Sequence, residues 1–344
     1  MPKIIIKGSW MQNYLEEAAK SLGIELVAMP ANLSQQEEID FVNTTPEVIA
    51  YLYFASWGGD YYKHIALMTP PKIFWNLEDP NHFDTFYKQA EPADIVITTA
   101  GELLNTYQQI YPDKRVDVLP WACEPKFHYP NVEDVEFKNR TYDLVFVGNR
   151  YPDQIDRVIG EHDVFLPALA WARERGKTFA VFGIGDQSIH SWRHVQEVWV
   201  DSKGRAPFGA FDFECKTRNP EYVGVYQSYT NSLVAGDIYR QSTVVICVNE
   251  QRNSPTMCSM RTFEACGCGN IVVSHDSWAT RNLFQGVWLS NSPSETVAIL
   301  DEIFFGDPGF VPSRQAQLMA GKALRHVYEH HTYAHRLMKL LEML

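Results

Sequence analysis

Residues 242–275 read STVVICVNEQRNSPTMCSMRTFEACGCGNIVVSH, and this stretch decides the fold. The β-branched run from Thr243 to Val248 predicts a buried strand, and the polar, proline-containing run after it predicts a loop. Ser259 is placed to cap a short helix, which ends near Gly267 before a second apolar strand begins at Asn270. A strand, a loop, a helix and a strand in this order are typical of a parallel α/β sheet, which binds ligands at the carboxyl ends of its strands.

Two charged side chains lie near the start of the predicted helix. Arg261 is beside the free N–H groups of the helix N-terminus, which favour an anion such as a diphosphate. Glu264 follows three residues later on the same face, where a carboxylate suits the paired hydroxyls of a ribose. The pair predicts a nucleotide-sugar site, although an arginine and a glutamate at this spacing often form a solvated surface pair.

A family resemblance is carried by the segment from Arg261 to Gly269, RTFEACGCG. It resembles the R-x-F-E-x-x-A-C-G segment of glycosyltransferases of the GT-B fold, related to families 1 and 4, and in particular their CgeB-like branch. Further support comes from Asp143–Gly148, Leu119–Ala122 and His331–Arg336. The resemblance covers the whole chain in order and is weakest before residue 70. It implies an α/β fold of two Rossmann-like domains that face a cleft, with a C-terminal helix crossing back to the first domain.

The expected domain boundaries follow from the composition along the chain. Residues 124–140 are charged and contain two prolines, which is typical of a linker. The segments before it alternate between strand and helix patterns, as in a doubly wound sheet. We therefore expect a Rossmann-like acceptor domain over residues 1–130 and a nucleotide-sugar donor domain over residues 131–320. A terminal helix over residues 321–344 is expected to pack on the first domain.

The resemblance implies that Glu264 holds the ribose of the donor, with Arg261 at its diphosphate. The other candidates for donor binding lie at the predicted strand ends and in the neighbouring helices and loops: Gly148, Asn149, Arg150, Arg157, Tyr226, Asn249 and Ser259. Retaining relatives carry the first glutamate of an E-x7-E pair where this chain has Thr256. In this chain, therefore, either no residue has the role of that glutamate or a residue at another position has it.

The acceptor side of the cleft is expected at the carboxyl ends of strands in the first domain. Five candidates follow its first and third strands: Gly8, Ser9, Trp10, Ser56 and Trp57. The candidate catalytic residues follow a strand over residues 72–76, and they are Glu78, Asp79 and His82. A carboxylate or an imidazole at this edge can act as a base, but Asp-Pro and Asn in the same segment are equally typical of a plain turn.

Composition and charge exclude several classes of protein. No run approaches eighteen apolar residues, so no membrane span is predicted, and the N-terminus becomes polar too quickly for a signal peptide, which favours a cytoplasmic location. Six cysteines without C-x2-C spacing indicate reduced thiols and no metal site. Residues 1–135 hold 9 Lys or Arg against 19 Asp or Glu, within a net charge of −12. An acidic first domain disfavours nucleic acids and anionic membranes as partners.

The sequence predicts a glycosyltransferase that moves a sugar from UDP-sugar, or from another nucleoside-diphosphate sugar, to an acceptor. The acceptor could be a glycan, a protein, a small molecule or a modified nucleic acid. No cofactor and no metal are expected beyond the nucleotide-sugar co-substrate, because arginines and backbone N–H groups can neutralise the leaving diphosphate. The FEACG-type segment favours retention of the anomeric configuration; if inversion occurs, Glu78, Asp79 or His82 is the candidate base.

Three alternatives stay open at this point. A nucleotide-sugar epimerase of the same fold would use the same donor residues. A sugar transferase that modifies DNA bases would need a binding surface for nucleic acid despite the acidic first domain. A non-catalytic protein that binds a sugar or a nucleotide would share the two-domain architecture, and it would be expected to carry the signal peptide that this sequence lacks.

Overall fold

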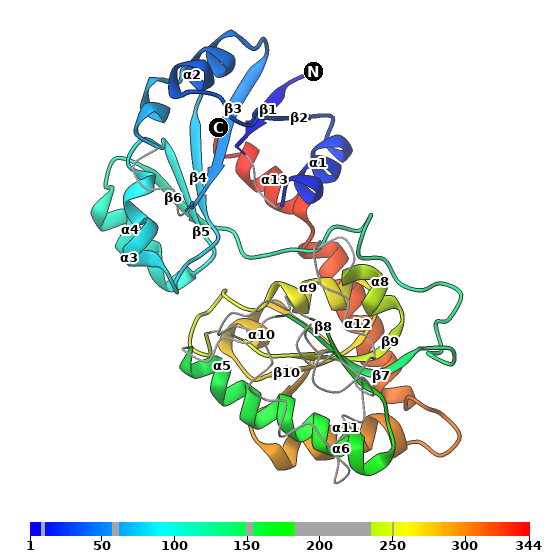
Figure 1. The fold of residues 1–344 in the computed structure, drawn as a ribbon. Coiled ribbons are helices and arrows are strands. Elements are labelled where there is room, and N and C mark those ends of the chain that lie inside the picture. The colour runs from blue at the N-terminus through cyan, green and yellow to red at the C-terminus, as the bar shows by residue number, and fades with distance from the viewer. Residues whose placement is uncertain (8–10, 57–61, 149–153, 183–234, 250) are drawn as a thin grey trace, which may run out of the picture. The chain divides into compact units, whose positions relative to one another are not determined.

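The structure is a computed structural model that describes residues 1–7, 11–56, 62–148, 154–182, 235–249 and 251–344. These residues form two compact units, each with its own parallel sheet (Figure 1). Unit 1 comprises Met1–Glu124, Ser254–Met257 and His330–Leu344. Unit 2 comprises Pro125–Asn253 and Cys258–Glu329.

The sheet of unit 1 has six parallel strands in the order β2-β1-β3-β4-β5-β6. The strands are β1 (Lys3–Ile6), β2 (Glu25–Ala28), β3 (Val48–Phe54), β4 (Lys72–Asn76), β5 (Ile95–Thr98) and β6 (Arg115–Val118). The central ones, β3 and β4, are mostly apolar and buried, because helices cover both faces of a parallel sheet. The helical segments are α1 (Gln12–Ser21), α2 (Gln35–Thr44), η1 (Lys63–Leu67), α3 (Phe83–Phe86), η2 (Tyr87–Ala90), η3 (Gly101–Leu103), α4 (Leu104–Ile110) and α13 (Tyr333–Leu341).

The last helix, α13, completes unit 1 from the far end of the sequence. Its Tyr333 ring stacks on Tyr14 of α1, with 5.5 Å between the ring centroids. The Arg336 side chain donates hydrogen bonds to the carbonyl oxygens of Pro120 and Trp121 at 2.7 and 2.8 Å. These contacts hold α13 against α1 and against the segment that follows β6.

The sheet of unit 2 has five parallel strands in the order β11-β10-β9-β7-β8. They are β7 (Tyr142–Val147), β8 (Phe179–Phe182), β9 (Ser242–Cys247), β10 (Ile271–His275) and β11 (Trp288–Ser290). The helical segments are α5 (Ile155–Gly160), η4 (Glu161–Phe165), α6 (Leu166–Arg175), α8 (Ala235–Arg240), α9 (Met260–Gly267), α10 (Trp278–Leu283), α11 (Pro293–Phe305) and α12 (Arg314–His330). Strand β8 lies on one side of β7, and β9 lies on the other. The carboxyl ends of β7 and β9 therefore meet at the topological switch point of the sheet, which is where open α/β sheets bind ligands.

The prediction of an α/β fold with two Rossmann-like sheets is confirmed. Two local predictions differ from the structure. The region expected to form one terminal helix over residues 321–344 forms two, because Thr332 leaves the helix, caps α13 and bridges to Cys123. Ser259 occupies the N-cap position of α9, but its side chain makes no capping hydrogen bond. In the described ranges, no helix is both long and apolar enough to cross a membrane.

Candidate functional site

The side chain of Arg261 extends from α9 to the carboxyl end of β7. Its Nε donates a hydrogen bond to the carbonyl oxygen of Val147, and its Cζ lies 4.2 Å from the centroid of the Phe146 ring. Gly148 leaves space for the guanidinium, because a Cβ on this residue would lie 1.8 Å from Nη2 of Arg261. Within the described part of the chain, the buried Nη1 has no hydrogen-bond partner. A buried guanidinium with an unused donor is suited to a phosphate oxygen.

Glu264 lies one turn further along α9 and is only 2% exposed. Its Oε2 accepts a hydrogen bond of 3.2 Å from the hydroxyl of Tyr239, in α8. Its Oε1 lies 3.5 Å from Nε2 of His128. Burial lowers the pKa of His128 to about 3, so the imidazole is neutral and this contact is not an ion pair. A carboxylate has about four acceptor positions, so each of its oxygens can accept more than one hydrogen bond.

Arg261 and Glu264 are therefore not a solvated surface pair. Arg261 is 7% exposed, and each of the two side chains contacts buried groups on other elements. Such burial is costly for charged groups unless they are held by specific partners. The arrangement fixes a cation and an anion on one helix, at the switch point of the sheet.

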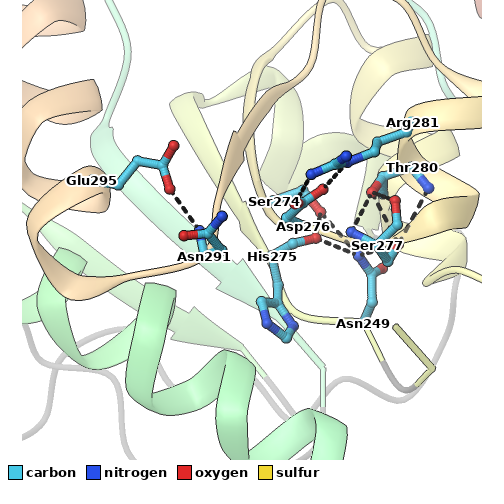
Figure 2. Close-up of polar contacts among 9 residues, drawn as sticks. All are labelled: Asn249, Ser274, His275, Asp276, Ser277, Thr280, Arg281, Asn291 and Glu295. Atoms are coloured by element: carbon cyan, nitrogen blue, oxygen red, sulfur yellow. Dashed lines mark hydrogen bonds and ion pairs between the residues drawn. The ribbon is translucent and has the colours of Figure 1, made fainter. Parts of the chain in front are cut away.

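Asn249 connects the start of α9 to the end of β10. Its Nδ2 donates to the carbonyl oxygen of His275 at 2.8 Å and to Oγ of Ser274 at 3.1 Å (Figure 2). Its Oδ1 accepts from the backbone N–H of Ser259 at 3.0 Å. Asn249 is fully buried, so in this conformation it positions the two turns.

The remaining candidates for donor binding are placed as follows. Arg157 is buried within α5. Asn149, Arg150 and Tyr226 lie outside the described residues, as do the acceptor-side candidates Gly8, Ser9, Trp10 and Trp57. Ser56 is described in unit 1, where its backbone N–H and carbonyl both bond to the side-chain amide of Gln89.

Glu78, Asp79 and His82 lie together on the turn between β4 and α3, with different exposure. Glu78 and His82 are partly exposed, whereas the carboxyl of Asp79 is enclosed. Asp79 accepts hydrogen bonds of 2.6 Å from both Asn76 Nδ2 and Thr98 Oγ1. Burial raises the pKa of Asp79 to about 7, despite the hydrogen bonds that oppose the shift. In this conformation, Asp79 organises the ends of β4 and β5.

Thr256, at the position where retaining relatives have a glutamate, belongs to unit 1. Its Oγ1 donates to the carbonyl oxygen of Thr99 at 2.8 Å and accepts from the N–H of Gly101 at 2.7 Å. The neighbouring Ser254 hydroxyl donates to Glu102 at 2.5 Å. The short segment Ser254–Met257 is thus attached to the turn after β5 by side-chain hydrogen bonds.

Two residues beside Glu264 were not predicted from the sequence. Tyr239 lies in the segment just before the strand that begins at Ser242, and His128 lies in the charged stretch that is typical of a linker. Neither carries a local motif, because each acts through a contact with a residue distant in sequence. For the described ranges of the chain, no group of three or more His, Cys, Asp or Glu side chains is arranged to hold a metal ion.

The chain is similar to known proteins both in sequence and in fold. A protein-family model described as "Glycosyl transferase-like" matches residues 164–342. No curated protein is similar enough in sequence to match. Solved structures do match, among them an alpha-glucosyltransferase in complex with UDP-glucose and DNA containing an abasic site. It has a TM-score of 0.63 and 12% identity, over 99% of this chain and 98% of that one.

Two further structures share the fold along nearly the whole chain. An alpha,alpha-trehalose-phosphate synthase (UDP-forming) from Burkholderia vietnamiensis has a TM-score of 0.59 and 10% identity, over 100% of this chain and 99% of that one. T4 phage BGT in complex with UDP and Mn²⁺ has a TM-score of 0.57 and 11% identity, over 96% and 95%. At these identities the structures establish the fold alone, whereas the family model spans more than half of the chain. The chain therefore belongs to the glycosyl transferase-like family and is a glycosyltransferase of the GT-B fold.

Proposed function

We propose that this glycosyltransferase takes its sugar from a UDP-sugar, which unit 2 binds at the carboxyl ends of β7 and β9. The observation that carries the proposal is the buried guanidinium of Arg261, held over Gly148 with Nη1 unused in the described structure. The three similar structures support UDP as the nucleotide, because one is a complex with UDP-glucose, one is a UDP-forming synthase and one is a complex with UDP.

In this proposal Arg261 neutralises the diphosphate as it leaves. Glycosyl transfer breaks the bond between the anomeric carbon and a phosphate oxygen, so negative charge grows on the diphosphate while the sugar becomes oxocarbenium-like. A cation fixed before the reaction stabilises that charge without having to reorganise. Glu264 accepts hydrogen bonds from the ribose hydroxyls and so sets the position of the nucleotide relative to Arg261.

The finer parts of the proposal concern the metal, the stereochemistry and the branch of the family. We propose that no metal is required, because Arg261 and backbone N–H groups supply the positive charge at the diphosphate. The RTFEACGCG segment supports membership of the CgeB-like branch and retention of configuration. Thr256 would then not act as a nucleophilic or acidic side chain, since its hydroxyl is engaged by Thr99 and Gly101.

Calorimetric titration of the full chain with UDP, GDP and dTDP tests the proposed donor site. We expect UDP to bind best, and Glu264→Gln to weaken its binding by about ten- to a hundredfold, the equivalent of about 1.5–3 kcal/mol for a hydrogen bond to a charged group. Glu295→Gln is a matched control, because Glu295 lies at the start of another helix of unit 2. A Glu264→Gln variant with the melting temperature and the UDP affinity of the wild type would refute the assignment.

A panel of nucleotide-sugars then tests the reaction. Release of free sugar, measured without an added acceptor, should occur with one or a few UDP-sugars, because water can slowly replace the acceptor. The anomeric configuration of the first sugar released, read by NMR, distinguishes retention from inversion. Interconversion of the nucleotide-sugar without release would instead identify an epimerase.

A second candidate is transfer of the sugar to DNA. It is supported by one similar structure, the alpha-glucosyltransferase in complex with UDP-glucose and DNA. The charge of residues 1–135 opposes it, with 9 Lys or Arg against 19 Asp or Glu. A filter-binding assay with duplex DNA at low salt decides the matter, because a DNA-binding enzyme must show affinity that falls steeply as salt is added.

A further inference from the structure

Unit 2 contains a small polar pocket between the start of α5, the loop after β9 and the start of α10, which we call the α10 pocket. Its volume is about 240 Å³, which is below the range of pockets for drug-sized ligands and therefore favours a smaller ligand. We propose that the α10 pocket binds a single neutral sugar residue. The proposal concerns side chains other than Arg261 and Glu264, so it can be tested separately from the proposed UDP site.

The pocket is shaped in advance by hydrogen bonds between its walls. The backbone N–H of Trp278 donates to the carbonyl oxygen of Arg252 at 2.9 Å, and the N–H of Arg252 donates to Asp156 Oδ2 at 2.9 Å. Asn249 also holds this turn in place, because its Nδ2 donates a hydrogen bond to the carbonyl oxygen of His275 (Figure 2). Three separate loops are thus tied together without a ligand, which lowers the entropic cost of binding one.

The charges that line the pocket cancel. The lining includes two carboxylates, of Asp156 and Asp276, and two guanidiniums, of Arg252 and Arg281. Arg281 is already neutralised, because its Nε donates to Asp276 Oδ1 at 2.7 Å and its Nη2 pairs with Oδ2 (Figure 2). A lining with no formal net charge gives little advantage to a phosphate or a cation. It does offer both donors and acceptors, which is what the hydroxyl groups of a sugar require.

The unused groups of the pocket are of the kind that recognises carbohydrate. Among the residues that the structure describes, the Arg252 guanidinium and the Asn253 amide have no hydrogen-bond or ion-pair partner, so both can bind hydroxyls. Trp278 is 60% exposed, which is unusual for so large an apolar ring. Its indole offers a flat surface to the C–H face of a sugar and an N–H at its edge. The remaining lining is polar, which disfavours a lipid or a purely apolar ligand.

The imidazole of His275 is not part of this recognition surface. Its ring points away from the Asn249–Ser277 cluster (Figure 2) and is fully buried. A Cβ on Gly160 of α5 would lie 2.7 Å from its Nδ1. Recognition therefore rests on the groups at the rim of the α10 pocket.

Ligand-observed NMR on the full chain tests the proposal, with the methyl glycosides of glucose, galactose, mannose and N-acetylglucosamine as probes. We expect saturable binding of at least one of them in the wild type. Trp278→Ala should weaken that binding by about three- to tenfold, whereas Trp278→Phe should largely restore it. Val132→Ala is a matched control, because Val132 is an exposed apolar residue of unit 2 outside the pocket.

The source of the sugar follows from a second titration, with UDP and with the UDP-sugar that the enzyme uses. If Trp278→Ala weakens the UDP-sugar but not UDP, the pocket holds the donor's sugar. If it weakens only the methyl glycoside, the pocket holds a sugar of the acceptor. Both results support the proposal.

Three results would overturn it. They are no saturable binding of any probe to the wild type, equal binding by Trp278→Ala, and tighter binding of inorganic phosphate than of every glycoside at this pocket. Glu264→Gln separates the two hypotheses, because it should strongly weaken UDP binding and leave the methyl glycoside bound. Failure of UDP to bind the wild type would count against the donor site and not against the α10 pocket.

Discussion

The position that a Cβ would occupy on Gly148 lies 1.8 Å from Nη2 of Arg261. The Arg261 side chain can therefore lie against the end of β7 only when residue 148 has no side chain. Gly148 also has a φ of 147°, which disfavours other residues. The geometry of the proposed diphosphate site thus depends on an absent side chain as much as on a charged one.

We expect Gly148→Ala to displace the Arg261 guanidinium and to weaken UDP binding by at least about tenfold, through loss of a charge-assisted hydrogen bond. The melting temperature should also fall, because the backbone at residue 148 is strained by a Cβ. Calorimetry and thermal melting measure the two effects. Gly321→Ala, at an open position in α12, should leave UDP affinity unchanged and stabilise the helix slightly. Normal UDP binding by Gly148→Ala would contradict this account.

Arg261→Lys should affect the diphosphate more than the nucleoside. Lysine keeps the positive charge but has a single donor nitrogen, so it lacks the planar fork in which one nitrogen donates to Val147 and a separate one is directed at the ligand. We expect UDP affinity to fall by about tenfold or more while uridine affinity stays close to that of the wild type. Titration of both ligands into both proteins gives the answer. Equal losses for UDP and uridine would indicate that Arg261 only supports the fold.

Tyr239→Phe should have a smaller effect, because it removes the hydroxyl that orients Glu264 and leaves the carboxylate in place. The expected cost is about 0.5–1.5 kcal/mol, or about two- to tenfold in UDP affinity. Affinity for inorganic diphosphate should not change. A double-mutant cycle with Glu264→Gln checks the mechanism, since the two losses should not add if both act through one carboxylate. Tyr142→Phe, on β7, serves as the control. Additive losses would refute the coupling.

The pH dependence of stability should carry a contribution from Asp79. Its pKa is raised to about 7 in the folded protein, so between about pH 4 and pH 7 the folded state binds more protons here than the unfolded state. This contribution to the free energy of unfolding falls as pH rises, by at most about 1.4 kcal/mol per pH unit, and is constant above pH 7.

Asp79→Asn should remove that slope, because asparagine resembles the protonated acid. Urea unfolding at pH 5, 6.5 and 8 should show the variant losing less stability than the wild type as pH rises. Turnover of the variant separates a structural role from a catalytic one. Near-normal turnover would leave Glu78 and His82 as the candidate bases, whereas a stable but inactive protein would favour Asp79.

Turnover should survive removal of metal ions by EDTA, since the proposed charge neutralisation uses Arg261. Assays with excess EDTA, then with added Mg²⁺ or Mn²⁺, measure this. The similar T4 phage BGT structure contains Mn²⁺ with UDP, so the assay distinguishes turnover without a metal ion from turnover that requires one. Activity that is lost with EDTA and restored by a metal ion would contradict the proposal.

Much of the fold could be predicted from the sequence because most strands are buried along the greater part of their length. The strand expected over residues 72–76 has these bounds in β4, and the strand expected from Thr243 to Val248 differs from β9 by one residue at each end. Helix α2 was missed because its residues are mostly polar, although Ser34 and Glu37 form a capping box that marks its start. Buried apolar runs are the strongest local signal, and exposed helices are among the weakest.

The candidate site was less predictable. The position of Arg261 and Glu264 on a helix follows from local pattern, so both were identified. The contacts of Tyr239 and His128 with Glu264 depend on how distant segments pack, and no local spacing encodes them. The enclosure of Asp79 likewise depends on Asn76 and Thr98, from two neighbouring strands, whereas the sequence around it resembles an ordinary turn.

Unit 1 is formed from segments that are distant in sequence, and this affects how the chain folds during synthesis. Residues 1–124 are synthesised first, yet the unit is closed by Ser254–Met257 and by α13, near the very end of the chain. Tyr333, Leu337 and Leu340 of α13 are fully buried, so a nascent chain that lacks them exposes the apolar surface they cover. Unit 1 therefore starts to leave the ribosome before unit 2, but it can complete its fold only after α13 has been synthesised. A stop codon just before α13 should damage the N-terminal half, although its own sequence is intact.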